Sequence, residues 1–134
     1  MLRTFSAVAV GAAVLGLTAL PAAAATATHP KVHSFTVPPV SGIKVWGSYS
    51  FSGGKADIKL CVKETASDIR YALAVGTAMN ATITKHQGIE VQLLGSDKQA
   101  CKSTVTSDTA HLYVEAISST ANGRARVGKA HKVY

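Results

Sequence analysis

The chain has 134 residues, with 14 Lys and Arg against 7 Asp and Glu, and its formal net charge at pH 7 is +7. Hydrophobic residues make up 47% of it, which excludes an intrinsically disordered composition, and the length suits one domain with its own core. The basic excess favours an anionic partner, and the alternative is that it serves only solubility, because no block of consecutive basic residues occurs.

The first 25 residues have the layout of a secretory signal peptide. Arg3 gives a positive start, and residues 5–20 form an apolar run. Pro21 ends the run, and Ala23-Ala24-Ala25 supplies the small residues at which signal peptidase cleaves. A membrane anchor is the alternative, but a spanning helix needs about 20 strongly apolar residues, and Ala and Gly dilute this run. We therefore predict cleavage after Ala25 and a secreted, extracellular protein without a membrane span.

Two regions are expected after the cleavage site. Residues 26–39 form a flexible leader with a candidate first strand at residues 31–37, and Pro38-Pro39 separates it from the rest. Residues 40–134 form a single β-domain.

The clearest hairpin of that domain turns at Gly53-Gly54. Apolar side chains alternate on both sides of it, and two glycines suit a two-residue loop because both can adopt positive φ. This register places Val45 opposite Val62 on an apolar face. It places Trp46 opposite Cys61 on the other face.

Shorter strands are predicted in the middle of the chain. An amphipathic helix capped by Ser67 is the alternative for the first of them, but alternation with period 2 fits it better. The predicted strands are residues 68–76, 81–86 (the weakest), 89–94 and 103–107.

A second hairpin is predicted at Asn122-Gly123, which is a strong hairpin signal. A two-residue loop would place Ser118 opposite Val127. Lys129 and His131 would then fall on the apolar side, so we expect a frayed end or a bulge that shifts the register.

These short strands predict an all-β fold, an antiparallel β-sandwich, with a small β-barrel as the alternative. Cys61 and Cys101 are the two cysteines, and in an exported chain we predict that they form one disulfide. A bridge that encloses about 40 residues contributes about 4 kcal/mol in the chain-entropy model.

Three residues are candidate ligand contacts. Trp46, the single tryptophan, either offers a stacking platform for a sugar ring or packs over Cys61 and its bridge, shielded by residues 95–102. Arg124 and Arg126 are predicted on one face at the tip of the second hairpin, where they would contact an anionic ligand. Asn80-Ala81-Thr82 also matches a glycosylation sequon.

Signatures of catalysis and of metal binding are missing from the sequence. It contains neither G-x-S-x-G nor H-E-x-x-H, and its 7 carboxylates are scattered singly. The 5 histidines lack the spacing of a zinc site. We expect no catalytic residue, no metal and no cofactor.

The segment Leu20-Pro21-Ala22-Ala23-Ala24-Ala25, followed by a short domain with two cysteines, resembles the small exported proteins of actinomycetes. The resemblance rests on layout and implies no activity. Secreted protease inhibitors of those organisms are similar in size but typically carry two disulfides, and this chain has cysteines for one.

We expect a secreted, non-enzymatic binding protein whose partner is an anionic cell-wall polymer or an extracellular protein. We do not expect nucleic acid as a partner. The alternatives are a secreted inhibitor or small toxin that acts on another protein, and a minor hydrolase. A protruding rigid loop with few charges would favour the inhibitor, and two carboxyl groups facing each other in a cleft would favour the hydrolase.

Signal cleavage is directly testable. N-terminal sequencing or intact mass of the secreted protein should give a chain that starts at Thr26, or at Thr28 if the next small-residue site is used. Met1 on the exported product would contradict the signal peptide.

Overall fold

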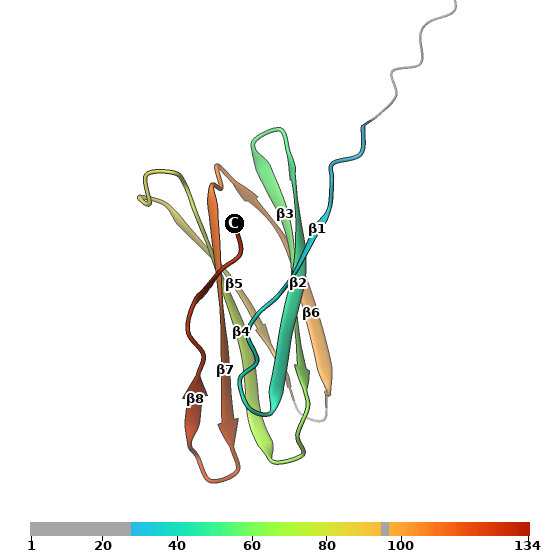
Figure 1. Cartoon of the computed structure of the whole chain (residues 1–134), viewed down its shortest axis with the longest axis vertical. Helices are drawn as coiled ribbons and strands as arrows, with labels where there is room; N and C mark the ends of the chain where they lie inside the picture. Colours follow the sequence, from blue (N-terminus) through green and yellow to red (C-terminus); the bar gives the residue numbers. More distant parts are fainter. Residues whose placement is uncertain (1–27, 95–96) are drawn as a thin grey trace, which may run out of the picture.

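The computed structural model describes residues 28–94 and 97–134, and the predicted signal peptide lies outside them. They fold as two antiparallel β-sheets that face each other (Figure 1). The strands are β1 (His33–Thr36), β2 (Ile43–Ser52), β3 (Lys55–Glu64), β4 (Ile69–Met79), β5 (His86–Gln92), β6 (Gln99–Ser107), β7 (His111–Thr120), β8 (Ala125–Val127) and β9 (His131–Lys132). The predicted all-β sandwich with one disulfide is confirmed. Within the described ranges, no helix has the length and hydropathy to cross a membrane.

The first sheet has the strand order β1-β2-β3-β6, and the second has the order β5-β4-β7-β8 with β9 also paired to β7. The chain builds β1 to β3, crosses to β4 and β5, returns to the first sheet as β6, and ends in the second sheet. This crossing makes β3 and β6 neighbours in space although β4 and β5 separate them in sequence.

The core lies between the sheets and takes every second residue from much of the long strands β2, β3, β4 and β7. Because successive side chains of a strand point to opposite faces, one side of each strand is buried and the other is free. The largest buried side chains come from four strands: Ile43, Ile58, Leu60, Ile89, Leu112, Val45, Val62 and Val114.

The first hairpin has the predicted register. Val45 pairs with Val62, and Trp46 pairs with Cys61. Gly53 and Gly54 have φ of 57° and 74°, so both adopt the left-handed conformation that this tight loop requires.

The second hairpin differs from the prediction by one residue. Ser118 pairs with Arg126, not with Val127. The Thr120 N–H donates to the Arg124 carbonyl, so the loop has three residues, with Gly123 last at φ 73°. A three-residue loop that ends in a left-handed glycine is the next commonest hairpin, and its extra residue shifts all partners by one.

A bulge then restores the predicted register beyond that hairpin. Val114 pairs with His131, and the Val133 N–H donates to the Leu112 carbonyl. The expected irregularity therefore lies between β8 and β9.

Strand β4 places its small residues inside. Ala72, Ala74 and Ala78 are buried, whereas Tyr71 and Leu73 lie on the outer face and are partly exposed. Small side chains leave room for the long ones of the opposite sheet, so β4 fits the core although its larger residues point outward. The weakest predicted strand, residues 81–86, is instead a loop up to Lys85, and only His86 belongs to a strand, as the first residue of β5.

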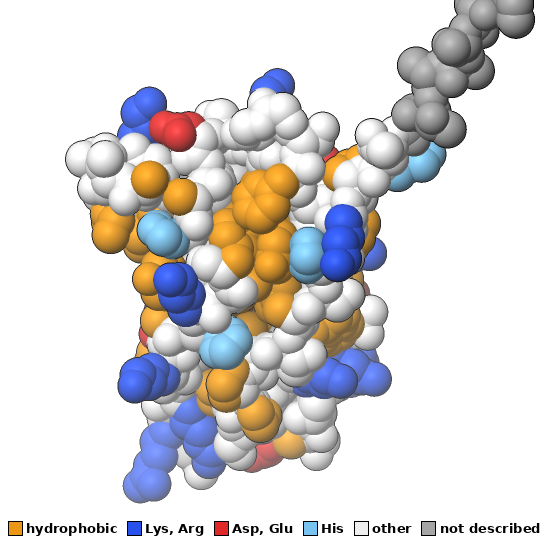
Figure 2. Space-filling view, turned by 45° about the horizontal axis from the view of Figure 1, so that its top comes forward, with side chains coloured by type: hydrophobic (Ala, Val, Ile, Leu, Met, Phe, Trp, Pro, Cys, Tyr) orange, Lys and Arg blue, Asp and Glu red, His pale blue; other side chains and the backbone are white. Residues whose placement is uncertain are grey.

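Aromatic side chains close one side of the sandwich. Tyr134 packs against Tyr49 and Phe51, with ring centroids 4.4 Å and 4.9 Å away, and His33 stacks on Tyr49. Figure 2 shows hydrophobic side chains gathered on this side, with histidines beside them. Burial, and after it the nearby Tyr49, raises the pKa of Tyr134 to about 12.

The alternation along β3 gives a stability test. Ile58 is buried and Lys59 is exposed, so Ile58→Ala should lower the free energy of unfolding by about 2–5 kcal/mol, and Lys59→Ala should change it by no more than about 0.5 kcal/mol. Denaturant titration measures both. Equal losses at the two positions would contradict the register of β3.

Candidate binding face on the first sheet

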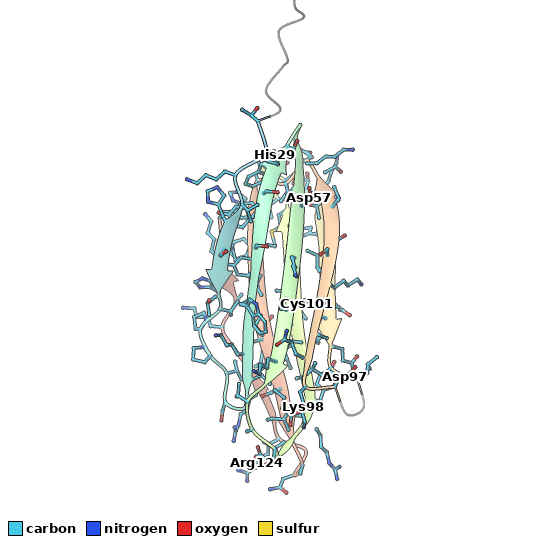
Figure 3. The ribbon with its side chains drawn as sticks, turned by 90° about the vertical axis from the view of Figure 1, so that its right-hand side faces the viewer. His29, Asp57, Asp97, Lys98, Cys101 and Arg124 are labelled. Carbon is cyan, nitrogen blue, oxygen red and sulfur yellow. A yellow bond between two sulfur atoms is a disulfide. The ribbon has the colours of Figure 1, made fainter. Side chains whose placement is uncertain are left out.

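The outer face of the first sheet collects the side chains of β1, β2, β3 and β6 that do not enter the core. We call this surface the lysine face. Its central residues follow from the strand registers as three neighbouring rows, written in the order β1, β2, β3, β6: Thr36, Trp46, Cys61, Cys101; then Ser34, Ser48, Lys59, Ser103; and, from β2 on, Ser50, Asp57, Val105. Two outer rows, also written from β2 on, complete the face: Lys44, Lys63, Gln99 at one end and Ser52, Lys55, Ser107 at the other. Figure 3 views this side of the molecule, with Cys101 near its middle.

The disulfide lies within this face. Cys61 and Cys101 are directly opposite each other on β3 and β6, with Cα atoms 4.1 Å apart. The bridge therefore links two strands of one sheet and does not tie the two sheets together. Cys61 is buried and Cys101 is exposed.

Trp46 lies beside the bridge and is partly exposed. It lines a hollow of about 290 Å³ together with both cysteines, so it contacts the disulfide region and a surface depression at once. The Lys44 ammonium nitrogen lies 5.8 Å from the centre of its ring. Its place beside the bridge agrees with packing over Cys61, and the stacking of a sugar ring on Trp46 stays a prediction. Gly95 and Ser96, of the segment proposed to shield it, lie outside the described residues.

A second hollow of about 480 Å³ adjoins the first. The two share Ser48 and Lys59, so they lie side by side on the face, and we call them together the groove. Val32 and Val105, which are 64% and 60% exposed, line the far part of the groove. Ser50 also lines it and is only 8% exposed.

Charge on the lysine face is strongly unbalanced. Among the described residues, the rows of this face carry four exposed lysines and a single carboxylate, that of Asp57. The lysines are Lys44, Lys55, Lys59 and Lys63. Lys44 and Lys63 are cross-strand partners, and like charges in that position destabilise a sheet.

The predicted arginines belong to a different part of the molecule. Arg124 is exposed at the tip of the β7–β8 hairpin, and Arg126 is exposed on its second strand, β8, in the second sheet. Figure 3 shows Arg124 at the lower end of the molecule, away from Cys101. The fold therefore does not bring the two arginines together with Trp46.

Carboxylates and histidines form no cluster in the described part of the chain. No group of three or more metal-ligating side chains occurs there. Glu64 pairs with Lys98 at 3.0 Å. Glu90 and Glu115 flank Val75 on the open outer face of the second sheet, and they line neither of the two hollows.

The loop between β4 and β5 is held by one buried side chain. The Asn80 amide nitrogen donates to the hydroxyls of Thr82 and Thr84, both at 3.0 Å. Its oxygen accepts from the N–H groups of Thr84 and Lys85, at 2.9 Å and 3.0 Å. Asn80 is 8% exposed, so the sequon residue serves the loop and is not free for a glycan in the folded domain.

Ile83 lies in this loop with φ of 57° and 53% of its surface exposed. A β-branched residue rarely adopts the left-handed conformation, because its Cβ crowds the backbone. No sequence signal pointed to this residue. The groove on the lysine face, by contrast, could have been predicted once Cys61 was placed opposite Cys101. That pair fixes the register of β6 and therefore the position of Ser103 next to Lys59.

No family model matches the chain, and no curated protein is found to be similar to it.

Proposed function

We propose that the protein is a secreted, non-enzymatic binding domain that holds an anionic extracellular polymer on its lysine face. The four lysines against one carboxylate on that face are the observation that carries the proposal. Secretion is supported by the signal-like first 25 residues and by the disulfide, which is typical of oxidising compartments.

The Lys44–Lys63 pair adds a physical reason. A sheet selected only for stability would place an opposite charge across from Lys44, since such pairs contribute favourably. A polymer with regularly spaced negative charges would relieve the repulsion between the two ammonium groups. Each exposed contact is weak, but several contacts to one chain act together through their high effective concentration.

The lysine pair gives a charge-matched test. The double variant Lys44→Gln/Lys63→Gln should weaken binding to polygalacturonate and to polyphosphate at low salt. Binding by the unmodified protein should fall steeply as the salt concentration rises, because the Debye length is only about 8 Å at physiological ionic strength. The same variant should be as stable as the parent or slightly more stable, because a like-charge pair is removed. Calorimetric titration and thermal melting measure the two effects.

Arg124→Gln/Arg126→Gln is the control, because it removes the same charge from the second sheet. A larger loss of binding in the arginine variant would place the site at the hairpin tip, as expected from the sequence. Binding that is absent at low salt, or unchanged at high salt, would contradict the proposal.

The β4–β5 loop favours a second candidate function, which is the binding of a protein partner as in an inhibitor or toxin. Ile83 is an exposed apolar side chain on a loop made rigid by Asn80, and its strained backbone costs about 1–3 kcal/mol. A rigid apolar anchor loses little conformational entropy when it enters a pocket of a partner.

Replacement of Ile83 by glycine tests this candidate. Ile83→Gly should raise the free energy of unfolding by on the order of 1 kcal/mol, because glycine adopts the left-handed conformation without a Cβ clash. It should also abolish retention of any extracellular protein that the parent retains. Val127→Ala, at another exposed apolar residue (61%), should preserve retention. Equal retention by the parent and by Ile83→Gly would exclude the loop as the contact.

A further inference from the structure

The groove on the lysine face carries more hydroxyl groups than charges. Its central row contains Ser34, Ser48, Lys59 and Ser103 in the order of the strands, so three hydroxyls and one ammonium follow one another across the sheet. Neighbouring strands are about 4.8 Å apart, which gives this row a length of roughly 14 Å.

This composition separates two kinds of polyanion. Phosphate and carboxylate oxygens only accept hydrogen bonds at neutral pH, so a polymer made of charged groups alone is best met by Lys, Arg or backbone N–H groups. A serine hydroxyl both donates and accepts, and so does a sugar hydroxyl. A row with three hydroxyls for each ammonium therefore fits a ligand in which several hydroxyls accompany each negative charge.

Trp46 supplies the remaining element. It occupies the row next to Ser48 and Lys59, about 6.6 Å further along the strand, and it lines the same groove. The C–H groups on one face of a sugar ring form an apolar surface that packs on an aromatic ring through dispersion, and ligand sites combine such contacts with a few convergent polar groups.

We infer that the polymer on the lysine face is an acidic polysaccharide, with a sugar ring packed against Trp46, its hydroxyls facing Ser48 and Ser103, and its carboxylate near Lys59. This inference rests on the proposed function, of which it specifies the ligand class. The buried Ser50 in the adjoining part of the groove extends the same hydroxyl-rich lining.

The single tryptophan provides the measurement, because the intrinsic tryptophan fluorescence of the folded protein reports only Trp46. Protein purified from the medium of a secreting host is titrated at low salt with polygalacturonate and with polyphosphate at equal concentrations of charge. We expect polygalacturonate to shift the emission of Trp46 and to bind at least about tenfold more tightly than polyphosphate.

Three variants separate sugar recognition from charge. Ser48→Ala/Ser103→Ala keeps every charge and should remove most of the preference for polygalacturonate. Trp46→Phe should do the same in calorimetry, and if this variant fails to fold, the serine variant alone decides. Lys44→Gln/Lys63→Gln should weaken both polymers and retain the preference.

The outcomes distinguish the two levels of the proposal. Equal binding of both polymers without a change in Trp46 emission would overturn the acidic-sugar inference and leave the polyanion-binding function standing. Binding of neither polymer would overturn both. Tighter binding of polygalacturonate that persists in the serine variant would also overturn the inference, since the hydroxyl row would then contribute nothing.

Discussion

Burial of one side of β3 determines most of this structure. β3 pairs with β2 on one edge and with β6 on the other, and its inward side chains are almost completely removed from water. Ile58, Leu60 and Val62 each contribute about 1.5–3 kcal/mol through the hydrophobic effect, and a slip by one residue would expose all the inward side chains. The same constraint holds Lys59, Cys61 and Lys63 on the outer face, next to Trp46 of β2. The composition of the lysine face is thus a consequence of the core.

The sequence allowed this hairpin and the disulfide to be predicted, because each depends on local signals. Gly53-Gly54 favours a tight loop, and two cysteines that follow a signal-like N-terminal segment can form a disulfide only with each other. The predicted register of the second hairpin was wrong by one residue. Asn-Gly fits loops of two and of three residues, and only packing decides between the two loop lengths. Alternation identified β4 as a strand but did not show that Ala72 and Ala74 face the core. That choice depends on the volume left by the opposite sheet.

The candidate site was only partly accessible to sequence reasoning. Trp46 could be singled out because it is the only tryptophan, and its place opposite Cys61 follows from the first hairpin. Ser48 follows from the same hairpin, but Ser34 and Ser103 come from β1 and β6, whose pairing with β2 and β3 the local sequence does not indicate. Arg124 and Arg126 were selected for their charge alone, and the topology places them in the other sheet. Nothing in the sequence indicated the left-handed conformation of Ile83, because this conformation contradicts the intrinsic backbone preference of isoleucine.

The open edge of the first sheet determines whether a strand of another chain can add to it. β6 is an edge strand, and Lys102 lies opposite Leu60, on the side of β6 that belongs to the core, yet its side chain is exposed. A strand of a second molecule that added to β6 would extend the sheet and enclose this ammonium group between two layers of apolar residues. The desolvation of the charge would oppose such growth, and inward-pointing charges on edge strands are one way in which β-proteins avoid aggregation. The charge of Lys102 thus disfavours the addition of another strand at the open edge of the sheet that carries the lysine face.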